Sequence, residues 1–206
     1  MLRCSTQLRR IAVRPLLPLL LFACVTGAAL PSLLVAQEDV VVFLVRHAER
    51  ADDGPGEGWT RENPMMAKDP PLSQAGRARG LRLSEILQDV GITSIYSTDF
   101  RRTKETVQPL AQAKGLDVML YDPDRLEEFA QELLARPGRH LVVGHSDTTP
   151  SLVEFLGGEP GRAIELLEYD RLYIVTPKGN GAQTLLLRFG TLYSQEPEGV
   201  TLSSGS

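Results

Sequence analysis

The sequence VVVFLVRHAER, at residues 40–50, passes abruptly from six apolar residues to charged and polar ones. Its apolar part, Val40–Val45, has the length and the β-branched content of a strand that is covered on both faces, as in a parallel sheet. Arg46 and His47 then follow the carboxyl end of that strand, which is where ligands bind in open α/β sheets. A guanidinium beside an imidazole at this place indicates an anion site with a nucleophile or a base, although a surface charge next to a capping residue would give the same dipeptide.

Residues 1–36 have the composition of an export signal. They contain four arginines and no acidic residue, and a leucine-rich apolar stretch follows the arginines. This order predicts a secretory signal peptide that is cleaved after Ala36, and therefore a periplasmic or extracellular protein. Cleavage before Cys24 would instead give a lipoprotein leader ending at Ala23 and a lipid anchor, because LFAC at residues 21–24 resembles a lipoprotein box. Prolines interrupt the apolar stretch, so no membrane span is expected.

The rest of the chain is acidic and contains no cysteine. Without the four leader arginines it has 18 Lys and Arg against 26 Asp and Glu, a net charge of −8. A body of this charge without a basic stripe argues against nucleic acid as a partner. Both cysteines, Cys4 and Cys24, lie in the leader, so the folded part must be held together by its core without disulfides.

Strand-like and helix-like segments alternate along residues 37–194, which predicts one domain followed by a flexible tail at 195–206. Apolar strands are expected at 40–45, 92–97, 116–121 and 140–144. Ser73 is expected to cap one helix, and Asp122-Pro123 to open another. Two further apolar runs, 172–175 and 184–189, predict a hairpin at one edge of the sheet. This order predicts an α/β fold, a three-layer αβα sandwich with a mostly parallel central sheet.

Polar side chains follow three of the predicted parallel strands. Arg46 and His47 follow the first strand, Arg101 and Arg102 follow the second, and His145 follows the fourth. Parallel strands bring their carboxyl ends to one edge of a sheet, so these side chains can converge. Two arginines, two histidines and the amino termini of helices at one point would form a metal-free site for a phosphate dianion.

With these residues the chain resembles the histidine phosphatase superfamily, whose members have the phosphoglycerate mutase-like fold. The resemblance rests on four short motifs in the family's order: Arg46-His47-Ala48-Glu49, LSQAG at residues 72–76, YSTDFRRTKET at 96–106, and VGHS at 143–146. Each motif alone would be weak, but four in this order at element boundaries are a specific signal. The resemblance covers about Val40–Gly190 and implies a histidine phosphatase domain at 37–194.

The resemblance also implies roles for four residues. His47 would be the nucleophile that takes the phosphoryl group, and Arg46 would bind phosphate and keep His47 neutral. Arg102 would be the second phosphate-binding arginine, in preference to Arg101, because its spacing to the following threonine matches the family block. His145 would donate to the oxygens of the transferring phosphoryl group. No cofactor and no metal are expected.

The acid that protonates the leaving group stays unassigned. Many family members use a glutamate between the second arginine and the second histidine, a place where this chain has Glu127 and Glu128 on a predicted helix. Helical geometry makes both of them solvated surface charges. Asp147 stands near the pocket in sequence but would also cap the next helix, and Glu49 is a further candidate.

The resemblance therefore implies an exported, metal-independent phosphomonoesterase of the histidine acid phosphatase type, acting on a small phosphorylated substrate or a phosphopeptide. A phosphoglycerate mutase-type phosphotransferase is an alternative, although Arg50–Asp53 do not continue the usual mutase motif RHGxSxWN. A non-catalytic phosphate-binding module on the same fold is another. A zinc hydrolase fits poorly, because His140 and His145 are five apart on a strand and point to opposite faces.

Overall fold

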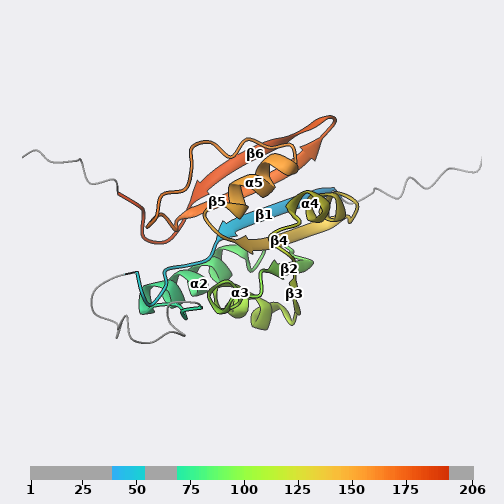
Figure 1. Cartoon of the computed structure of the whole chain (residues 1–206). Coiled ribbons are helices and arrows are strands. Elements are labelled where there is room, and N and C mark those ends of the chain that lie inside the picture. Colours follow the sequence, from blue (N-terminus) through green and yellow to red (C-terminus); the bar gives the residue numbers. More distant parts are fainter. Residues whose placement is uncertain (1–38, 54–68, 195–206) are drawn as a thin grey trace, which may run out of the picture. The chain divides into compact units, whose positions relative to one another are not determined.

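The computed structural model describes residues 39–53 and 69–194, which form a six-stranded sheet covered by helices (Figure 1). The strands are β1 Val40–Arg46, β2 Ser94–Ser97, β3 Val118–Leu120, β4 Gly138–Gly144, β5 Arg171–Lys178 and β6 Gly181–Arg188. Their order in the sheet is β3-β2-β4-β1-β5-β6. The pairs among β1 to β4 are parallel, and β5 and β6 form an antiparallel hairpin at one edge. The predicted α/β class and the edge hairpin are therefore confirmed.

Helices cover both faces of this sheet. They are α2 Gln74–Leu87, α3 Arg101–Lys114, α4 Leu126–Leu134 and α5 Thr148–Phe155. Helices α2 and α3 pack on one face in a core cluster that contains Phe43 of β1, and α4 and α5 pack on the other face in a cluster that contains Leu44 of β1. Successive residues of β1 thus enter opposite cores, as the period of two in a strand requires. The fold is the predicted three-layer sandwich.

The start of α2 is fixed against the segment that leaves β1. The Ser73 hydroxyl accepts a hydrogen bond from the Gly76 N–H at 3.0 Å, which confirms Ser73 as the N-cap. The Ser73 N–H donates to the carbonyl oxygen of Glu49 at 3.0 Å. A Cβ atom on Gly76 would lie 2.2 Å from that same oxygen, so this position requires glycine. This contact explains why the motif at 72–76 accompanies the motif at 46–49.

The start predicted for α4 was wrong. The helix begins at Leu126, with Arg125 before it, and not at Asp122-Pro123. The Asp122 carboxylate instead accepts a hydrogen bond from the Asp124 N–H at 2.9 Å and forms a turn that precedes the helix. An Asp-Pro pair is equally suited to a turn and to a first helical turn, so the pattern alone could not separate the two.

Two predictions concern segments that the structure does not describe. The leader at 1–36 and the tail at 195–206 lie outside the described residues. Within the described part of the chain, no helix has the length and apolar character needed to cross a membrane.

Candidate active site

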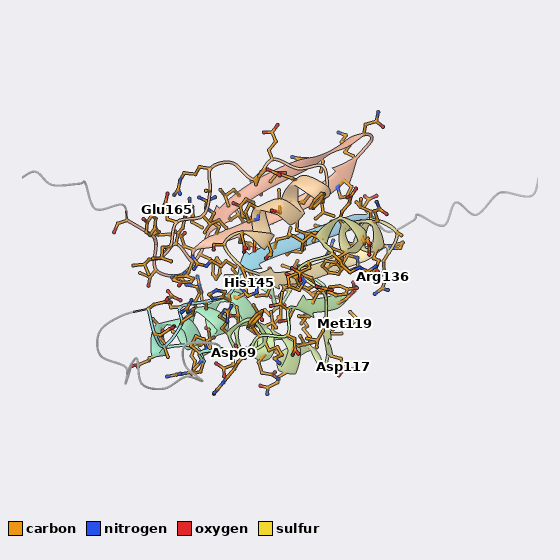
Figure 2. All side chains as sticks on the ribbon, in the orientation of Figure 1. Asp69, Asp117, Met119, Arg136, His145 and Glu165 are labelled. Carbon is orange, nitrogen blue, oxygen red and sulfur yellow. The ribbon has the colours of Figure 1, made fainter. Side chains whose placement is uncertain are left out.

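The structure brings the predicted side chains together at the carboxyl ends of β1, β2 and β4. Arg46 ends β1, and the N–H of His47 donates to the carbonyl oxygen of Gly144 at 2.9 Å, which holds His47 beside the end of β4. His145 directly follows β4 (Figure 2). The ring centroids of His47 and His145 are 5.5 Å apart, and Arg102 lies 3.4 Å from His145 between Nη2 and Nδ1. Four residues spread over a hundred positions therefore form one cluster.

His47 is buried as a neutral imidazole. Its side chain is 3% exposed, and its Nδ1–H donates to the carbonyl oxygen of Ala48 at 2.8 Å. That bond fixes the tautomer, so Nε2 keeps its lone pair. The pKa of His47 is lowered to about 2, chiefly by burial and also by the positive charges of Arg46 and Arg102, while the hydrogen bond to Ala48 opposes them. A neutral Nε2 beside two cations is suited to attack an electrophile that carries negative charge.

Arg46 is held by a segment that precedes β5. Its Nη1 donates to the carbonyl oxygens of Glu165 and Glu168 at 2.9 and 3.1 Å, and its Nη2 donates to the hydroxyl of Tyr169 at 3.3 Å. The Nε–H of Arg46 is buried and has no partner within residues 39–53 and 69–194. Burial lowers the pKa of Arg46, yet a guanidinium stays charged at neutral pH. Its charge and its open Nε are therefore available for an anion.

Arg102 lies in the cluster and Arg101 does not, as the spacing of Arg102 to Thr106 predicts. The Arg102 side chain is 13% exposed, its guanidinium lies 4.2 Å over the ring of Phe100, and its Nε–H is buried without a partner. The Arg101 side chain is 58% exposed and forms an ion pair with Glu105 at 2.6 Å. Only Arg102 therefore belongs to the cluster. Asp69 forms an ion pair with Arg102 at 3.5 Å and lies at the edge of the site.

His145 is oriented by hydroxyl groups of the segment after β2. Its Nε2 lies 3.0 Å from the hydroxyl of Thr98, which in turn lies 3.0 Å from the hydroxyl of Thr103. This leaves Nδ1 as the nitrogen that faces Arg102. Burial lowers the pKa of His145 to about 4, Arg102 lowers it too, and Asp147 opposes them. A phosphate dianion in the cluster would favour protonation of Nδ1, because an adjacent negative charge stabilises the imidazolium.

The candidate acids lie in different environments, and Glu128 is exposed on α4 as predicted, which leaves three to compare. The carboxylate of Glu49 accepts bonds from the buried guanidinium of Arg79 at 2.7 to 3.0 Å, which engages it outside the cluster. Glu127 is exposed on α4. Asp147 is exposed and accepts a hydrogen bond from the N–H of Thr148 at 2.8 Å, as the N-cap of α5. Of the three, only Asp147 influences a residue of the cluster, through its charge on His145.

The sequence analysis did not identify the buried Glu168, which stabilises the segment 162–171 that contacts Arg46. Its carboxylate is fully buried and accepts hydrogen bonds from the side chains of Arg162, Arg171 and Arg188 and from the N–H of Glu165. Burial would raise the pKa of Glu168, but these bonds hold it at about 2. No regular spacing in the sequence predicts that residues 162–171 contact β1. The sequence indicated this segment only through the acidic and aromatic residues at 165–170, which precede the hairpin.

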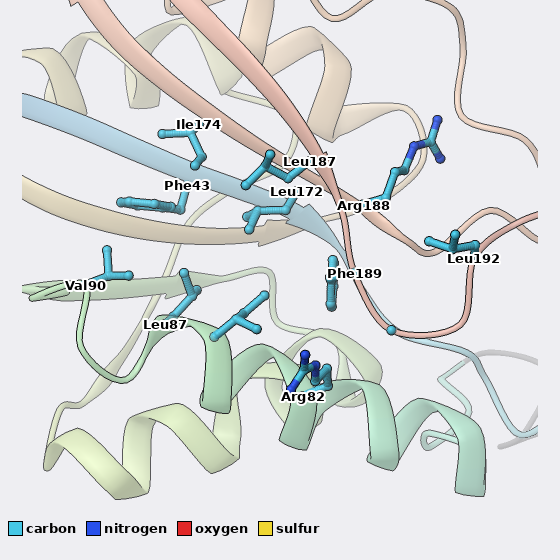
Figure 3. Close-up of a pocket in the computed structure, with 12 residues that line it drawn as sticks. Phe43, Arg82, Leu87, Val90, Leu172, Ile174, Leu187, Arg188, Phe189 and Leu192 are labelled. Atoms are coloured by element: carbon cyan, nitrogen blue, oxygen red, sulfur yellow. The ribbon is translucent and has the colours of Figure 1, made fainter.

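A separate groove of about 520 Å³ lies between α2 and the β5–β6 hairpin (Figure 3). Its walls are mainly apolar and include Leu87, Leu172, Ile174 and Phe189. None of the four clustered residues lines it. The groove therefore offers apolar surface but none of the groups that could perform phosphate chemistry at the strand ends.

The buried histidines predict a pH dependence of stability. The pKa values of His47, His140 and His145 are all lowered by burial. As pH falls below about 6.5, the unfolded chain takes up protons that the folded chain does not, so the free energy of unfolding should decrease between pH 7 and pH 5. Urea unfolding at both pH values checks this, and the decrease should be smaller in His47→Asn. An unchanged free energy would contradict neutral burial of these rings.

Comparisons with known proteins point to one family. A family model described as Histidine phosphatase superfamily (branch 1) matches residues 42–128. A protein of Salmonella paratyphi A named Probable phosphoglycerate mutase GpmB is 33% identical over 162 residues, which are 72% of this chain and 69% of that protein. A protein of the same name from Cronobacter sakazakii is 36% identical over 101 residues, 48% of this chain and 42% of that protein. The chain thus matches less than half of this second relative.

Solved structures share the fold. The protein histidine phosphatase SixA complexed with tungstate has a TM-score of 0.55 at 18% identity, with 72% of this chain and 96% of that chain covered. Bacillus stearothermophilus YhfR has a TM-score of 0.51 at 17% identity, with 69% and 94% covered. At these identities the likeness concerns the arrangement of strands and helices alone.

Proposed function

Because the chain belongs to the histidine phosphatase superfamily, we propose that it is a metal-independent phosphomonoesterase whose nucleophile is His47. One observation supports this proposal most. Within residues 39–53 and 69–194, the buried side-chain nitrogen and oxygen atoms without a hydrogen-bond partner are the Nε atoms of Arg46 and Arg102. Buried donors are almost always paired, so these two flanking the neutral His47 favour an oxyanion ligand.

The reaction proceeds in two displacements at phosphorus. Nε2 of His47 attacks the phosphoryl group, and the bond to the ester oxygen breaks with its electron pair leaving on that oxygen. A water molecule then attacks the phosphohistidine and the bond between phosphorus and Nε2 breaks with its electron pair returning to nitrogen. The proton that the water loses balances the one taken up from solvent by the leaving alkoxide, so alcohol and phosphate are released and the imidazole is neutral again. Arg46, Arg102 and a protonated Nδ1 of His145 stabilise the charge on the equatorial oxygens in both steps.

We expect the purified full-length protein to hydrolyse p-nitrophenyl phosphate at the same rate with and without an excess of EDTA. The reason is that two guanidiniums and an imidazole supply the positive charge that a metal ion would otherwise supply. The measurement is the release of nitrophenolate, with a zinc-dependent phosphatase as the control for chelation. Loss of activity in EDTA that returns on adding a divalent metal would instead favour a metallohydrolase.

A phosphoglycerate mutase-type activity is the second candidate, because the relatives from Salmonella paratyphi A and Cronobacter sakazakii carry that name. The residues after the first motif favour hydrolysis. Asp52 pairs with Arg50, and Asp53 accepts a hydrogen bond from Tyr169 beside Arg46. With these partners, residues 50–53 do not continue the usual mutase motif RHGxSxWN. Interconversion of 2- and 3-phosphoglycerate, measured against release of inorganic phosphate, separates the two activities.

The substrate is proposed as a small phosphate ester or a phosphopeptide, and the protein as an exported one. Support for export is the arginine-rich start and apolar stretch of residues 1–36, which resemble a signal peptide. Amino-terminal sequencing of the protein recovered from the periplasm and medium of a producing bacterium would give the cleavage site. A mature start at Gln37 supports a plain signal peptide, and a lipid-modified start at Cys24 supports an anchored lipoprotein.

A further inference from the structure

Tyr169 contacts the guanidinium of Arg46 in two ways. The Cζ atom of Arg46 lies 4.1 Å from the centroid of the Tyr169 ring, and the Tyr169 hydroxyl accepts a bond from Nη2 at 3.3 Å. The ring also lies 5.8 Å from that of His47, between centroids. Tyr169 is 4% exposed, so it contacts both residues inside the protein. A buried aromatic face against a guanidinium restricts the plane in which that guanidinium can lie.

The contacts of Arg46 leave one edge of its guanidinium open. Nη1 donates to the carbonyl oxygens of Glu165 and Glu168, and Nη2 donates to Tyr169. Within the described residues the buried Nε–H has no partner, and it shares one edge of the guanidinium with Nη2, which carries a second N–H. Two parallel N–H groups match two oxygens of a phosphate. Tyr169 thus helps to select the edge that Arg46 presents.

Tyr169 also connects Arg46 to the residues that follow the first motif. Its hydroxyl donates to Oδ2 of Asp53 at 2.6 Å, and the same oxygen accepts from the N–H of Arg50 at 2.6 Å. The hydroxyl therefore has one acceptor in Asp53 and one donor in Arg46. These two hydrogen bonds fix the position of the hydroxyl. We therefore expect a change at Asp53 to alter the position of the Arg46 guanidinium.

The backbone that carries Tyr169 is fixed by the neighbouring Glu168. Arg171 donates to the buried Glu168 carboxylate at 2.7 and 2.9 Å, and the N–H of Glu165 donates to it at 3.0 Å. The Glu168 N–H in turn donates to the carbonyl oxygen of Glu165 at 3.1 Å, which closes a turn. Both carbonyl oxygens that hold Arg46 belong to this turn. Tyr169 therefore directly follows a turn whose backbone is fixed by these hydrogen bonds.

We propose that Tyr169 is a positioning residue, which together with Asp53 sets the orientation of Arg46 for binding the transferring phosphoryl group. This inference rests on the proposed phosphatase function of the site. It assigns to Tyr169 no contact with substrate and no proton transfer. Its effect is on the geometry of Arg46, so it matters most where the oxygens are arranged around phosphorus as in the transition state.

The test compares Tyr169→Phe, which removes the hydroxyl, with Tyr169→Leu, which also removes the ring. We expect kcat/KM for p-nitrophenyl phosphate to fall about tenfold in the first and about 100-fold in the second. The inhibition constant of orthovanadate, which mimics the transition state, should weaken more than that of phosphate. A residue with a merely structural role would not change the ratio of these two constants.

Tyr173→Phe is the matched control. Tyr173 is fully buried on β5, and its hydroxyl accepts from Arg171 at 2.7 Å and donates to the carbonyl oxygen of Pro160 at 3.0 Å. Its removal should lower the melting temperature as much as Tyr169→Phe does but leave kcat/KM within about twofold. Equal losses of activity in the two variants, or an unchanged vanadate-to-phosphate ratio in Tyr169→Phe, would overturn the inference.

A double-mutant cycle tests the connection to Asp53. If Asp53 acts through the Tyr169 hydroxyl, adding Asp53→Asn to Tyr169→Phe should reduce activity by clearly less than the product of the two single effects. Fully multiplicative effects would overturn this part. Failure of the proposed function would be recognised separately, as absence of turnover in the unmodified protein. In that case the affinity for tungstate, measured by calorimetry, tests the role of Tyr169. Weaker binding in Tyr169→Phe than in Tyr173→Phe supports the inference, and equal binding overturns it.

Discussion

In His47→Ala, hydrolysis of p-nitrophenyl phosphate should fall by about 10⁴-fold or more, because this change removes the group that attacks phosphorus. The expectation follows from the buried, neutral ring, whose Nδ1–H donates to the Ala48 carbonyl oxygen so that Nε2 keeps its lone pair. A second readout is the intermediate itself. Because phosphohistidine hydrolyses in acid, the reaction should be stopped in alkali. Mass spectrometry then locates the phosphoryl group on the protein.

His140→Asn is the control for loss of a buried histidine. His140 is fully buried, and its ring nitrogens contact the Ser94 hydroxyl at 3.0 Å and the carbonyl oxygen of Arg136 at 2.8 Å, away from the cluster. Its loss should reduce stability and leave kcat/KM of the folded fraction nearly unchanged. Activity of His47→Ala equal to that of the unmodified protein would reject His47 as the nucleophile. Phosphate binding without turnover in the unmodified protein would favour a non-catalytic module.

The second large effect is expected from Arg102→Ala, which should lower kcat/KM by about 10²- to 10³-fold. Arg102 provides a mostly buried guanidinium next to His145, and its buried Nε–H has no partner in the described part of the chain. Steady-state kinetics on the same ester measure the loss. Arg102→Lys should recover only part of it, because an ammonium group cannot present two parallel donors to a phosphate.

The neighbouring Arg101→Ala is the matched control for this variant. Arg101 has the same charge and adjoins Arg102 at the start of α3, but its side chain is exposed and pairs with Glu105. Exposed pairs of this kind contribute little, so its removal should change kcat/KM by less than about twofold. Equal losses in the two variants would mean that long-range charge, rather than contact with phosphate, is responsible.

Much of the fold could be predicted because the decisive signals are local. The apolar run at 40–45, the cap at Ser73 and the hairpin at 172–189 each depend on neighbouring residues, and the structure has all three. The start of α4 failed because Asp122-Pro123 satisfies turn and helix equally well. The convergence of Arg46 and His145 could also be predicted, since the parallel topology alone brings strand ends together. Their chemical roles remain predictions.

The surroundings of the cluster could not be predicted in the same way. Tyr169, the carbonyl oxygen of Glu168 and the Arg79–Glu49 ion pair act across the fold, because their contacts with Arg46 or with each other join residues 30 to 123 positions apart. No periodicity or cap connects such positions. The pattern also could not rank the causes of the low pKa of His47, for which burial exceeds the effect of Arg46. Burial is a property of the assembled core and not of the motif.

The support of Arg46 has a consequence for how the protein comes into being. All four reacting side chains precede Ser146, whereas the carbonyl oxygens that hold Arg46 belong to Glu165 and Glu168. A nascent chain that emerges from the ribosome with its reacting groups complete would still lack these acceptors for a guanidinium that the mature fold buries. Phosphate chemistry at the proposed site would then begin only once residues 165–168 have been made, and products truncated before them would be inert although they carry all four clustered side chains.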